Sequence, residues 1–84
     1  MSPIEETLRT FVIDNYLYGD GDNLRANTSF EEKGIIDSTG MLDLILFLEE
    51  TYSIKIEDNE VVKSNFDSLE KIAQYVKKKT SLAA

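Results

Sequence analysis

Histidine and cysteine are both absent from the 84 residues of this chain. Without cysteine, the chain can form no disulfide and supplies no thiolate for catalysis or metal binding. Without histidine, it lacks the most common general base and the most common metal ligand in proteins. Serine–histidine and cysteine–histidine catalysis are therefore excluded, and we predict that the chain is not an enzyme.

Long apolar segments are absent as well. No run reaches the roughly 18 apolar residues that a membrane-spanning helix needs, and no basic stretch followed by an apolar one has the pattern of a secretion signal. The composition, 42% hydrophobic and 30% charged, is typical of a folded globule. The sequence predicts one cytoplasmic domain over residues 1–84, with an ordered core over residues 3–79.

Positive charge is scarce in the middle of the chain. The net charge is −7, and residues 31–60 hold nine acidic residues against two lysines, so this segment accounts for all of it. Such a field repels nucleic acids and anionic membranes, and it attracts partner proteins that have a basic surface. A generic acidic surface would explain solubility but not this concentration of charge in one segment.

The hydrophobic periodicity predicts an all-α fold, a small bundle of three longer helices plus one short helix, with a long first loop. Ser2 and Pro3 are suited to the start of a helix over residues 3–17. A dense apolar run rich in Leu and Glu favours a helix over residues 41–52. Residues 57–63 suit the short helix. The last long helix is expected over residues 69–79, where three final lysines complement the helix dipole.

The segment between the first two long helices, residues 18–36, shows no periodicity. A connection of this length is unusual in a compact domain unless it is anchored, and we expect Leu24, Phe30 and Ile35 to anchor it. The helix over residues 41–52 has more apolar residues than one buried face needs, so it is either central or presents an exposed apolar patch. We assign to the core Leu42, Leu44, Ile45 and Leu48. If the core has a cavity for a carried chain, the aromatic residues Phe47, Tyr52 and Tyr75 either fill that cavity or line it.

The boundary between the long loop and the apolar helix holds an Asp-Ser pair, and residues 34–44 read GIIDSTGMLDL. This arrangement resembles the modification site of acyl and peptidyl carrier proteins. The resemblance continues through FLEETY at residues 47–52 and IKI at residues 54–56 to NFDSL at residues 65–69, and it covers most of residues 4–79.

The resemblance implies that Ser38 carries a covalent 4′-phosphopantetheine arm. A helix N-terminus stabilises the negative charge of a phosphodiester, and Asp37 can cap the helix. By the same resemblance, Asp37 helps to position coenzyme A and Mg²⁺ in the transferase that attaches the arm. Nothing in this chain can activate the Ser38 hydroxyl, so a partner enzyme must carry out the attachment.

The resemblance also implies a set of partner enzymes. An adenylating ligase would load an acyl or aminoacyl group onto the arm as a thioester, and condensing or tailoring enzymes would then act on it. We expect a monomer in a dedicated biosynthetic pathway, with no metal of its own. Rim charges favour fast, reversible encounters, which suit a shuttle. The candidate docking residues are Thr39, Met41, Asp43, Leu46, Glu49 and Glu50.

The residues after Ser38 depart from the family pattern. Many carriers have leucine after the modified serine, whereas here Thr39 and Gly40 follow. A glycine in a helix costs about 1 kcal/mol relative to alanine, so the sequence predicts a loose first turn. The departure favours dedicated partners over those of a general fatty-acid carrier.

A second Asp-Ser pair, Asp67-Ser68, is rejected as the modification site. Asp67 and Glu70 have the spacing of a capping box, and only one helix follows them. The rival interpretation of the whole chain is a small acidic helical adaptor that binds a basic partner and is never modified. In that case Ser38 would be only a helix N-cap.

A calcium-loop spacing is also present but incomplete. Asp20, Asp22 and Glu31 occupy positions one, three and twelve of such a loop. Leu24 and Arg25 stand where the loop needs an oxygen ligand and a glycine, so we predict no calcium site.

Overall fold

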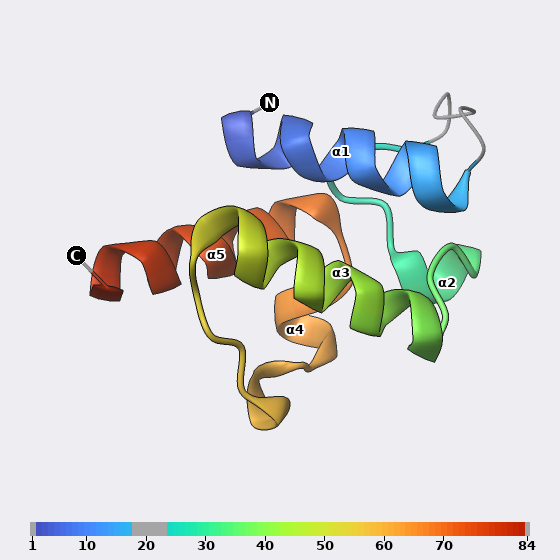
Figure 1. Cartoon of the computed structure of the whole chain (residues 1–84). Coiled ribbons are helices and arrows are strands. Elements are labelled where there is room, and N and C mark those ends of the chain that lie inside the picture. Colours follow the sequence, from blue (N-terminus) through green and yellow to red (C-terminus); the bar gives the residue numbers. More distant parts are fainter. Residues whose placement is uncertain (1, 18–23, 84) are drawn as a thin grey trace.

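The computed structural model describes residues 2–17 and 24–83 (Figure 1). All regular secondary structure in these residues is helical, as predicted, and three of the helices are long. The elements are α1 (Pro3–Tyr16), α2 (Phe30–Lys33), α3 (Ser38–Tyr52), the 3-10 turn η1 (Asp58–Glu60), α4 (Lys63–Phe66) and α5 (Leu69–Ala83). None of the helices in these residues is long and apolar enough to cross a membrane.

The long helices begin and end at residues that satisfy their free backbone groups. Ser2 accepts a hydrogen bond from the Glu5 N–H at 3.2 Å, and Pro3 stands in the first turn of α1. At the far end of α3, Ser53 adopts the left-handed conformation with φ 53°, which ends the helix.

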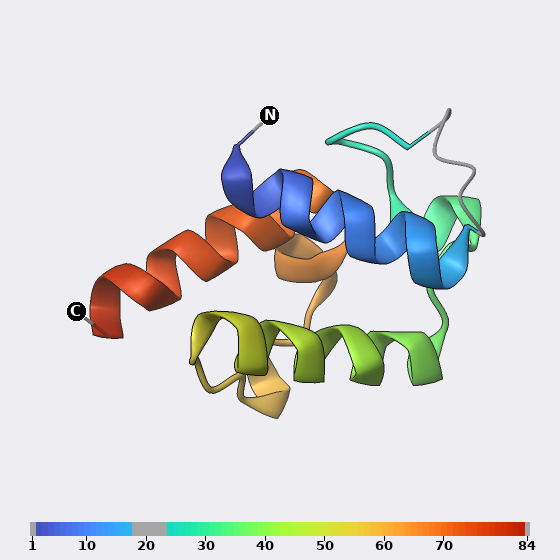
Figure 2. The ribbon, with the colours of Figure 1, turned by 45° about the horizontal axis from the view of Figure 1, so that its top comes forward.

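The core lies where α1, α3 and α5 meet. The α1 and α3 helices run in opposite directions, and the two views agree that α5 lies against both (Figures 1 and 2). Each long helix contributes fully buried aliphatic side chains: Leu8 and Val12 from α1, Leu44 and Leu48 from α3, and Leu69, Ile72 and Val76 from α5.

One core assignment is wrong. Leu42 is 63% exposed, because the buried stripe of α3 follows Gly40, Leu44 and Leu48 at intervals of four residues. Leu42 and Leu46 lie two positions away from this stripe and point outward. Of the two arrangements left open for α3, the structure has the one with an exposed apolar patch.

The expected short helix is divided in two. In place of one helix over residues 57–63, η1 ends at Glu60, and α4 begins at Lys63. The β-branched Val62 between them has extended dihedral angles, φ −127° and ψ 159°, which interrupt a helix. Glu60 stabilises this region by accepting hydrogen bonds from the Glu57 N–H at 3.0 Å and from Lys79 at 3.0 Å.

Helix α5 continues to Ala83, past the expected end at Lys79. The three lysines at residues 77–79 therefore do not occupy its last turn, and the predicted dipole role is wrong. Lys79 instead forms an ion pair with Glu60.

The described part of the first loop is anchored as predicted. Leu24 and Phe30 are buried, and Ile35 packs against the core. The unpredicted helix α2 begins at Ser29, which accepts the Glu32 N–H, and it ends at Gly34, which has a φ of +63°. The glycine-rich break expected at residues 19–23 lies outside the described residues.

Candidate functional site

Ser38 is the first residue of α3 and is exposed to solvent. It lies at the end of the molecule where α1 ends and α2 packs (Figure 1). The helix N-cap is Asp37, whose carboxylate accepts the Gly40 N–H at 2.7 Å, as predicted. The Ser38 hydroxyl has no capping role, and the interpretation of Ser38 as only an N-cap is wrong.

Ser68 differs from Ser38 in each of these respects. It is only 4% exposed, and its hydroxyl oxygen accepts the Lys71 N–H at 3.2 Å, which makes it the N-cap of α5. The predicted capping box of Asp67 and Glu70 is therefore wrong, because the cap is one residue later. A buried capping serine is poorly placed for modification.

Asp67 has a different role, which the sequence analysis missed. It is 7% exposed, and its carboxylate accepts hydrogen bonds from the Ser29 hydroxyl at 2.5 Å and the Glu31 N–H at 3.0 Å. The Phe30 N–H donates to the Asp67 carbonyl at 2.8 Å. Asp67 thus fastens the end of the first loop, just before the Asp-Ser pair, to the junction of α4 and α5.

The pKa of Asp67 lies below its usual value. Burial by itself would raise the pKa, but the hydrogen bonds from Ser29 and Glu31 and the positive charges of Lys63 and Lys71 together outweigh it. The carboxylate is therefore ionised at neutral pH, as its acceptor role requires.

Gly40 is buried under the ring of Tyr16, which belongs to the last turn of α1. The Tyr16 hydroxyl donates a hydrogen bond to the Gly40 carbonyl at 2.7 Å. A Cβ atom at residue 40 would stand 2.9 Å from Cε1 of Tyr16. The glycine that departs from the family pattern therefore has a packing role, since the Tyr16 side chain packs directly against the backbone of residue 40.

The Tyr16 phenol stays protonated at neutral pH. Burial raises its pKa, and the nearby carboxylates of Asp43 and Asp37 raise it further. The hydroxyl is therefore available as a donor.

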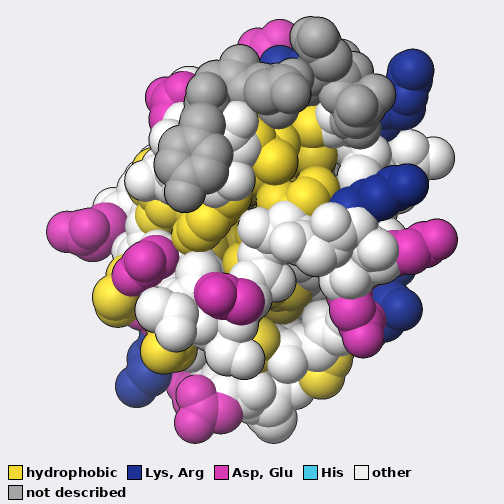
Figure 3. All heavy atoms as spheres, turned by 90° about the vertical axis from the view of Figure 1, so that its right-hand side faces the viewer, with side chains coloured by type: hydrophobic (Ala, Val, Ile, Leu, Met, Phe, Trp, Pro, Cys, Tyr) yellow, Lys and Arg dark blue, Asp and Glu magenta, His cyan; other side chains and the backbone are white. Residues whose placement is uncertain are grey.

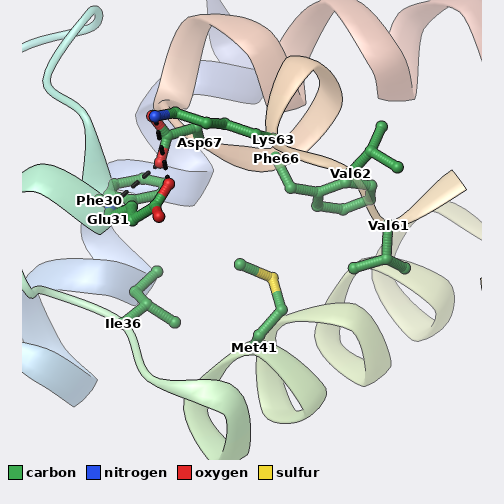
Figure 4. Close-up of a pocket in the computed structure, with 9 residues that line it drawn as sticks. All are labelled: Phe30, Glu31, Ile36, Met41, Val61, Val62, Lys63, Phe66 and Asp67. Atoms are coloured by element: carbon green, nitrogen blue, oxygen red, sulfur yellow. Dashed lines mark hydrogen bonds and ion pairs between the residues drawn. The ribbon is translucent and has the colours of Figure 1, made fainter.

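Two cavities adjoin the Ser38 turn. The first has a volume of about 540 Å³ and is lined by Ile36, Asp37, Ser38, Met41, Leu42, Ile45, Asp58 and Val61. The second, of about 310 Å³, is lined by Phe30, Glu31, Ile36, Met41, Val61, Val62, Lys63, Phe66 and Asp67 (Figure 4). They share Ile36, Met41 and Val61, so the cavity at Ser38 lies next to the one lined by Phe30 and Phe66.

The second cavity has a charged rim. Lys63 and Glu31 form an ion pair of 3.2 Å at the surface, with both side chains largely exposed. Hydrogen bonding and charge attraction from Glu31 raise the pKa of Lys63, so the ammonium is retained at neutral pH. Figure 4 shows the apolar residues of α3 and the preceding loop facing Phe30 and Phe66 across the cavity.

The three aromatic residues that were expected either to fill or to line a cavity, Phe47, Tyr52 and Tyr75, do not line these two cavities. Phe47 stacks on Phe11 with ring centroids 4.2 Å apart, and Tyr75 packs against Phe66 at 4.9 Å. Tyr52 is half-buried at the end of α3.

The candidate docking residues fall into three groups. Thr39, Asp43, Leu46 and Glu50 are exposed. Met41 is half-buried and borders both cavities. Glu49 is half-buried, and its carboxylate accepts the Ile56 N–H at 2.9 Å, so it holds the chain that leaves α3.

Sequence reasoning missed Leu42 as a surface residue. Leu42 and Leu46 are 63% and 58% exposed and lie one turn apart on α3. Their spacing relative to Leu44 and Leu48 was the available signal. Figure 3, which looks onto the end of the molecule that holds α2 and the start of α3, shows an apolar area with acidic side chains to its left and below it and basic side chains to its right.

The calcium-loop spacing is not described by the structure. Asp20 and Asp22 lie outside the described residues, and Glu31 forms the ion pair with Lys63.

Comparison with known proteins gives similarities to a curated protein and to solved structures. The chain is 27% identical over 75 residues, 89% of its length and 86% of the relative, to "Probable acyl carrier protein PigG" of Serratia sp. (strain ATCC 39006). It also matches a chain of a solved structure described as "Crystal structure of FAD-dependent dehydrogenase", with a TM-score of 0.75 and 29% identity, covering 82% of this chain and 97% of that chain. No family model matches the sequence.

Proposed function

We propose that this chain, a member of the acyl carrier protein family, holds a thioester-linked acyl or aminoacyl intermediate on a phosphopantetheine arm attached to Ser38. The observation that carries the proposal is the contrast between the two serines that follow an aspartate. Ser38 is exposed at the start of a 15-residue helix that Asp37 caps, whereas Ser68 is buried and caps a helix itself.

The chain's own contribution to the attachment is presentation. The transferase joins the Ser38 oxygen to the phosphorus atom on the pantetheine side of the coenzyme A diphosphate. The P–O bond of the diphosphate breaks, and adenosine 3′,5′-bisphosphate leaves. The Ser38 proton passes to a base of the transferase, because this chain has no histidine and no other group that activates the hydroxyl. The positive end of α3 favours the phosphodiester that results.

The bound arm supplies a thiol, which the chain lacks. An adenylating ligase would form the thioester, and tethering would then raise the effective concentration of the cargo for the next enzyme. The cavities that begin at Ser38 offer the tethered group an apolar surface next to its attachment point. The exposed pair Leu42 and Leu46, with Asp43 and Glu50 beside it, is the surface best suited to dock basic partners.

The modification is tested with coenzyme A, Mg²⁺ and a promiscuous phosphopantetheinyl transferase, followed by intact-mass measurement. The wild-type chain should gain the mass of one phosphopantetheine group, and Ser38→Ala should gain none. Ser64→Ala, which removes an exposed serine on α4, and Ser68→Ala should both be modified. No gain in the wild type would favour the unmodified adaptor, and a gain that persists in Ser38→Ala would overturn the site assignment.

A flavin-dependent dehydrogenase is the partner that we propose in addition. Because 82% of this chain covers 97% of the matched chain, the matched chain is shorter than this one. A helical chain of that size cannot contain the two βαβαβ halves of a dinucleotide-binding fold. We infer that this chain serves a flavin-dependent dehydrogenase as its partner.

The chemistry of such a partner is a two-electron oxidation of the carried group. A hydride would pass to FAD and a proton to an enzyme base, which leaves a new double bond in the acyl group, FADH⁻ in the enzyme and the proton on the base. The test loads the chain with acyl and aminoacyl groups from synthetic coenzyme A thioesters and adds a carrier-dependent flavin dehydrogenase. The carrier-bound group should lose the mass of two hydrogen atoms, while the same group on free pantetheine should not.

A further inference from the structure

In the first turn of α3, both backbone groups of Gly40 bond to side chains of residues outside the helix. The Gly40 N–H donates to the Asp37 carboxylate at 2.7 Å, and the Gly40 carbonyl accepts from the Tyr16 hydroxyl at 2.7 Å. The Met41 N–H donates to the Asp37 carbonyl at 2.8 Å. Gly40 is only two residues after Ser38, so these bonds fix the turn on which the serine stands.

The contact with α1 depends on the glycine. A Cβ atom on residue 40 would stand 2.9 Å from the Tyr16 ring, 3.3 Å from Oδ1 of Asp37 and 3.3 Å from Cγ2 of Ile36. The Tyr16 ring also contacts Phe11, which meets it edge-to-face with centroids 5.9 Å apart. A side chain at residue 40 would therefore press on a ring that is already packed and hydrogen-bonded.

We infer that Tyr16 is a positioning residue for the modification of Ser38, an inference that rests on the proposed function. Tyr16 reaches from α1 to the Gly40 carbonyl and keeps the first turn of α3 formed. Without the hydroxyl, the turn opens for part of the time, and only the closed fraction of molecules is competent to bind the transferase. The apparent affinity of the transferase for the chain then falls by that fraction, while catalysis in the complex is unchanged.

The test is the steady-state kinetics of phosphopantetheine transfer to Tyr16→Phe, which keeps the ring and removes only the hydroxyl. The KM for the apo chain should rise by about 2- to 10-fold, the range expected for the loss of one partly buried hydrogen bond, with kcat unchanged. Tyr52→Phe, which removes a hydroxyl at the other end of α3, is the matched control and should keep the wild-type KM. The Gly40 and Met41 amides should exchange hydrogen faster in Tyr16→Phe alone.

A purely structural role for Tyr16 predicts a different result. The melting temperature would fall, but KM measured well below both melting temperatures would equal that of the wild type, and that outcome overturns the inference. Gly40→Ala, which displaces the ring from the α3 side, provides a second approach and should raise KM in the same direction. If the wild-type chain is not modified at all, the proposed function fails; if only the effect of Tyr16 is missing, this inference alone fails.

Discussion

The presence of glycine rather than alanine at residue 40 has two opposite effects on the stability of the fold. Alanine in a helix is favoured over glycine by about 1 kcal/mol. A methyl group 2.9 Å from the Tyr16 ring forces a packed contact apart, which costs about 1–3 kcal/mol. Which effect dominates depends on the ring, and the ring can be removed by mutation.

Gly40→Ala is therefore expected to destabilise the wild-type chain by about 1 kcal/mol and to stabilise a Tyr16→Ala chain by about the same amount. Urea unfolding of the four proteins in this double-mutant cycle measures both changes. A change of the same sign in both backgrounds would show that the ring is not what requires the glycine.

At the scale of single residues, the sequence predicts a local cap such as Asp37 better than a contact between distant residues. Asp37 was predicted as the cap of α3 because its side chain acts on a backbone group three residues later. The contact between Tyr16 and Gly40 spans 24 residues. Periodicity identifies a helix face but not the side chain that packs against it, so the glycine was interpreted only as a weakness of the helix.

Among the helices, Asp67 joins the first loop to the junction of α4 and α5. Its pKa in the folded chain lies below the unfolded value, so its ionised form stabilises the fold above the unfolded pKa. This stabilisation is lost as the pH falls through the folded pKa.

Asp67→Asn should cost about 2 kcal/mol of stability at neutral pH, because hydrogen bonds to a charged acceptor are weakened or lost. The difference in stability between wild type and variant should narrow as the pH falls below the unfolded pKa of about 4 and on through the lower folded pKa, where the carboxylate of the folded wild type becomes protonated. Urea unfolding between neutral pH and acid measures this. Asp14→Asn, at an exposed position on α1, is the control; a gap for Asp67→Asn that does not change with pH would refute the electrostatic explanation.

The elements themselves were largely predictable. The long helices follow from apolar periodicity, and α3 was recognised despite its dense apolar composition. The same composition does not show which face of α3 is buried. Leu42 and Leu44 are equally apolar, and only contact with α1 and α5 decides which of the two is buried. The helix α2 was missed because four residues are too few to show a period.

For the molecule as a whole, the acidic residues fall into those that bind other groups of the chain and those left exposed on α3. Three acids of residues 31–60 bind groups of the same chain: Glu31 pairs with Lys63, Glu60 pairs with Lys79, and Glu49 accepts the Ile56 N–H. Asp43 and Glu50 remain exposed on α3, beside the apolar pair Leu42 and Leu46.

Modification by a transferase with a basic surface should therefore slow as ionic strength rises, through a lower kcat/KM. The double variant Asp43→Asn/Glu50→Gln should reduce the slope of this salt dependence. Glu6→Gln, an exposed change on α1 that removes one charge away from α3, should leave the slope close to that of the wild type. A slope that falls in Glu6→Gln as well, in proportion to the charge removed, would assign the steering to the net charge rather than to α3.

The bond between the first loop and Asp67 also has a consequence for the order in which the chain is assembled during synthesis. Ser29 and Glu31 leave the ribosome long before Asp67, which follows them by 38 and 36 residues. Until the C-terminal half emerges, the loop that leads to Ser38 has no anchor, and α1 and α3 lack the α5 side chains on which they pack. A nascent chain that ends before α5 would therefore be a poor substrate for the transferase. The attached arm would then mark chains whose synthesis and folding are complete.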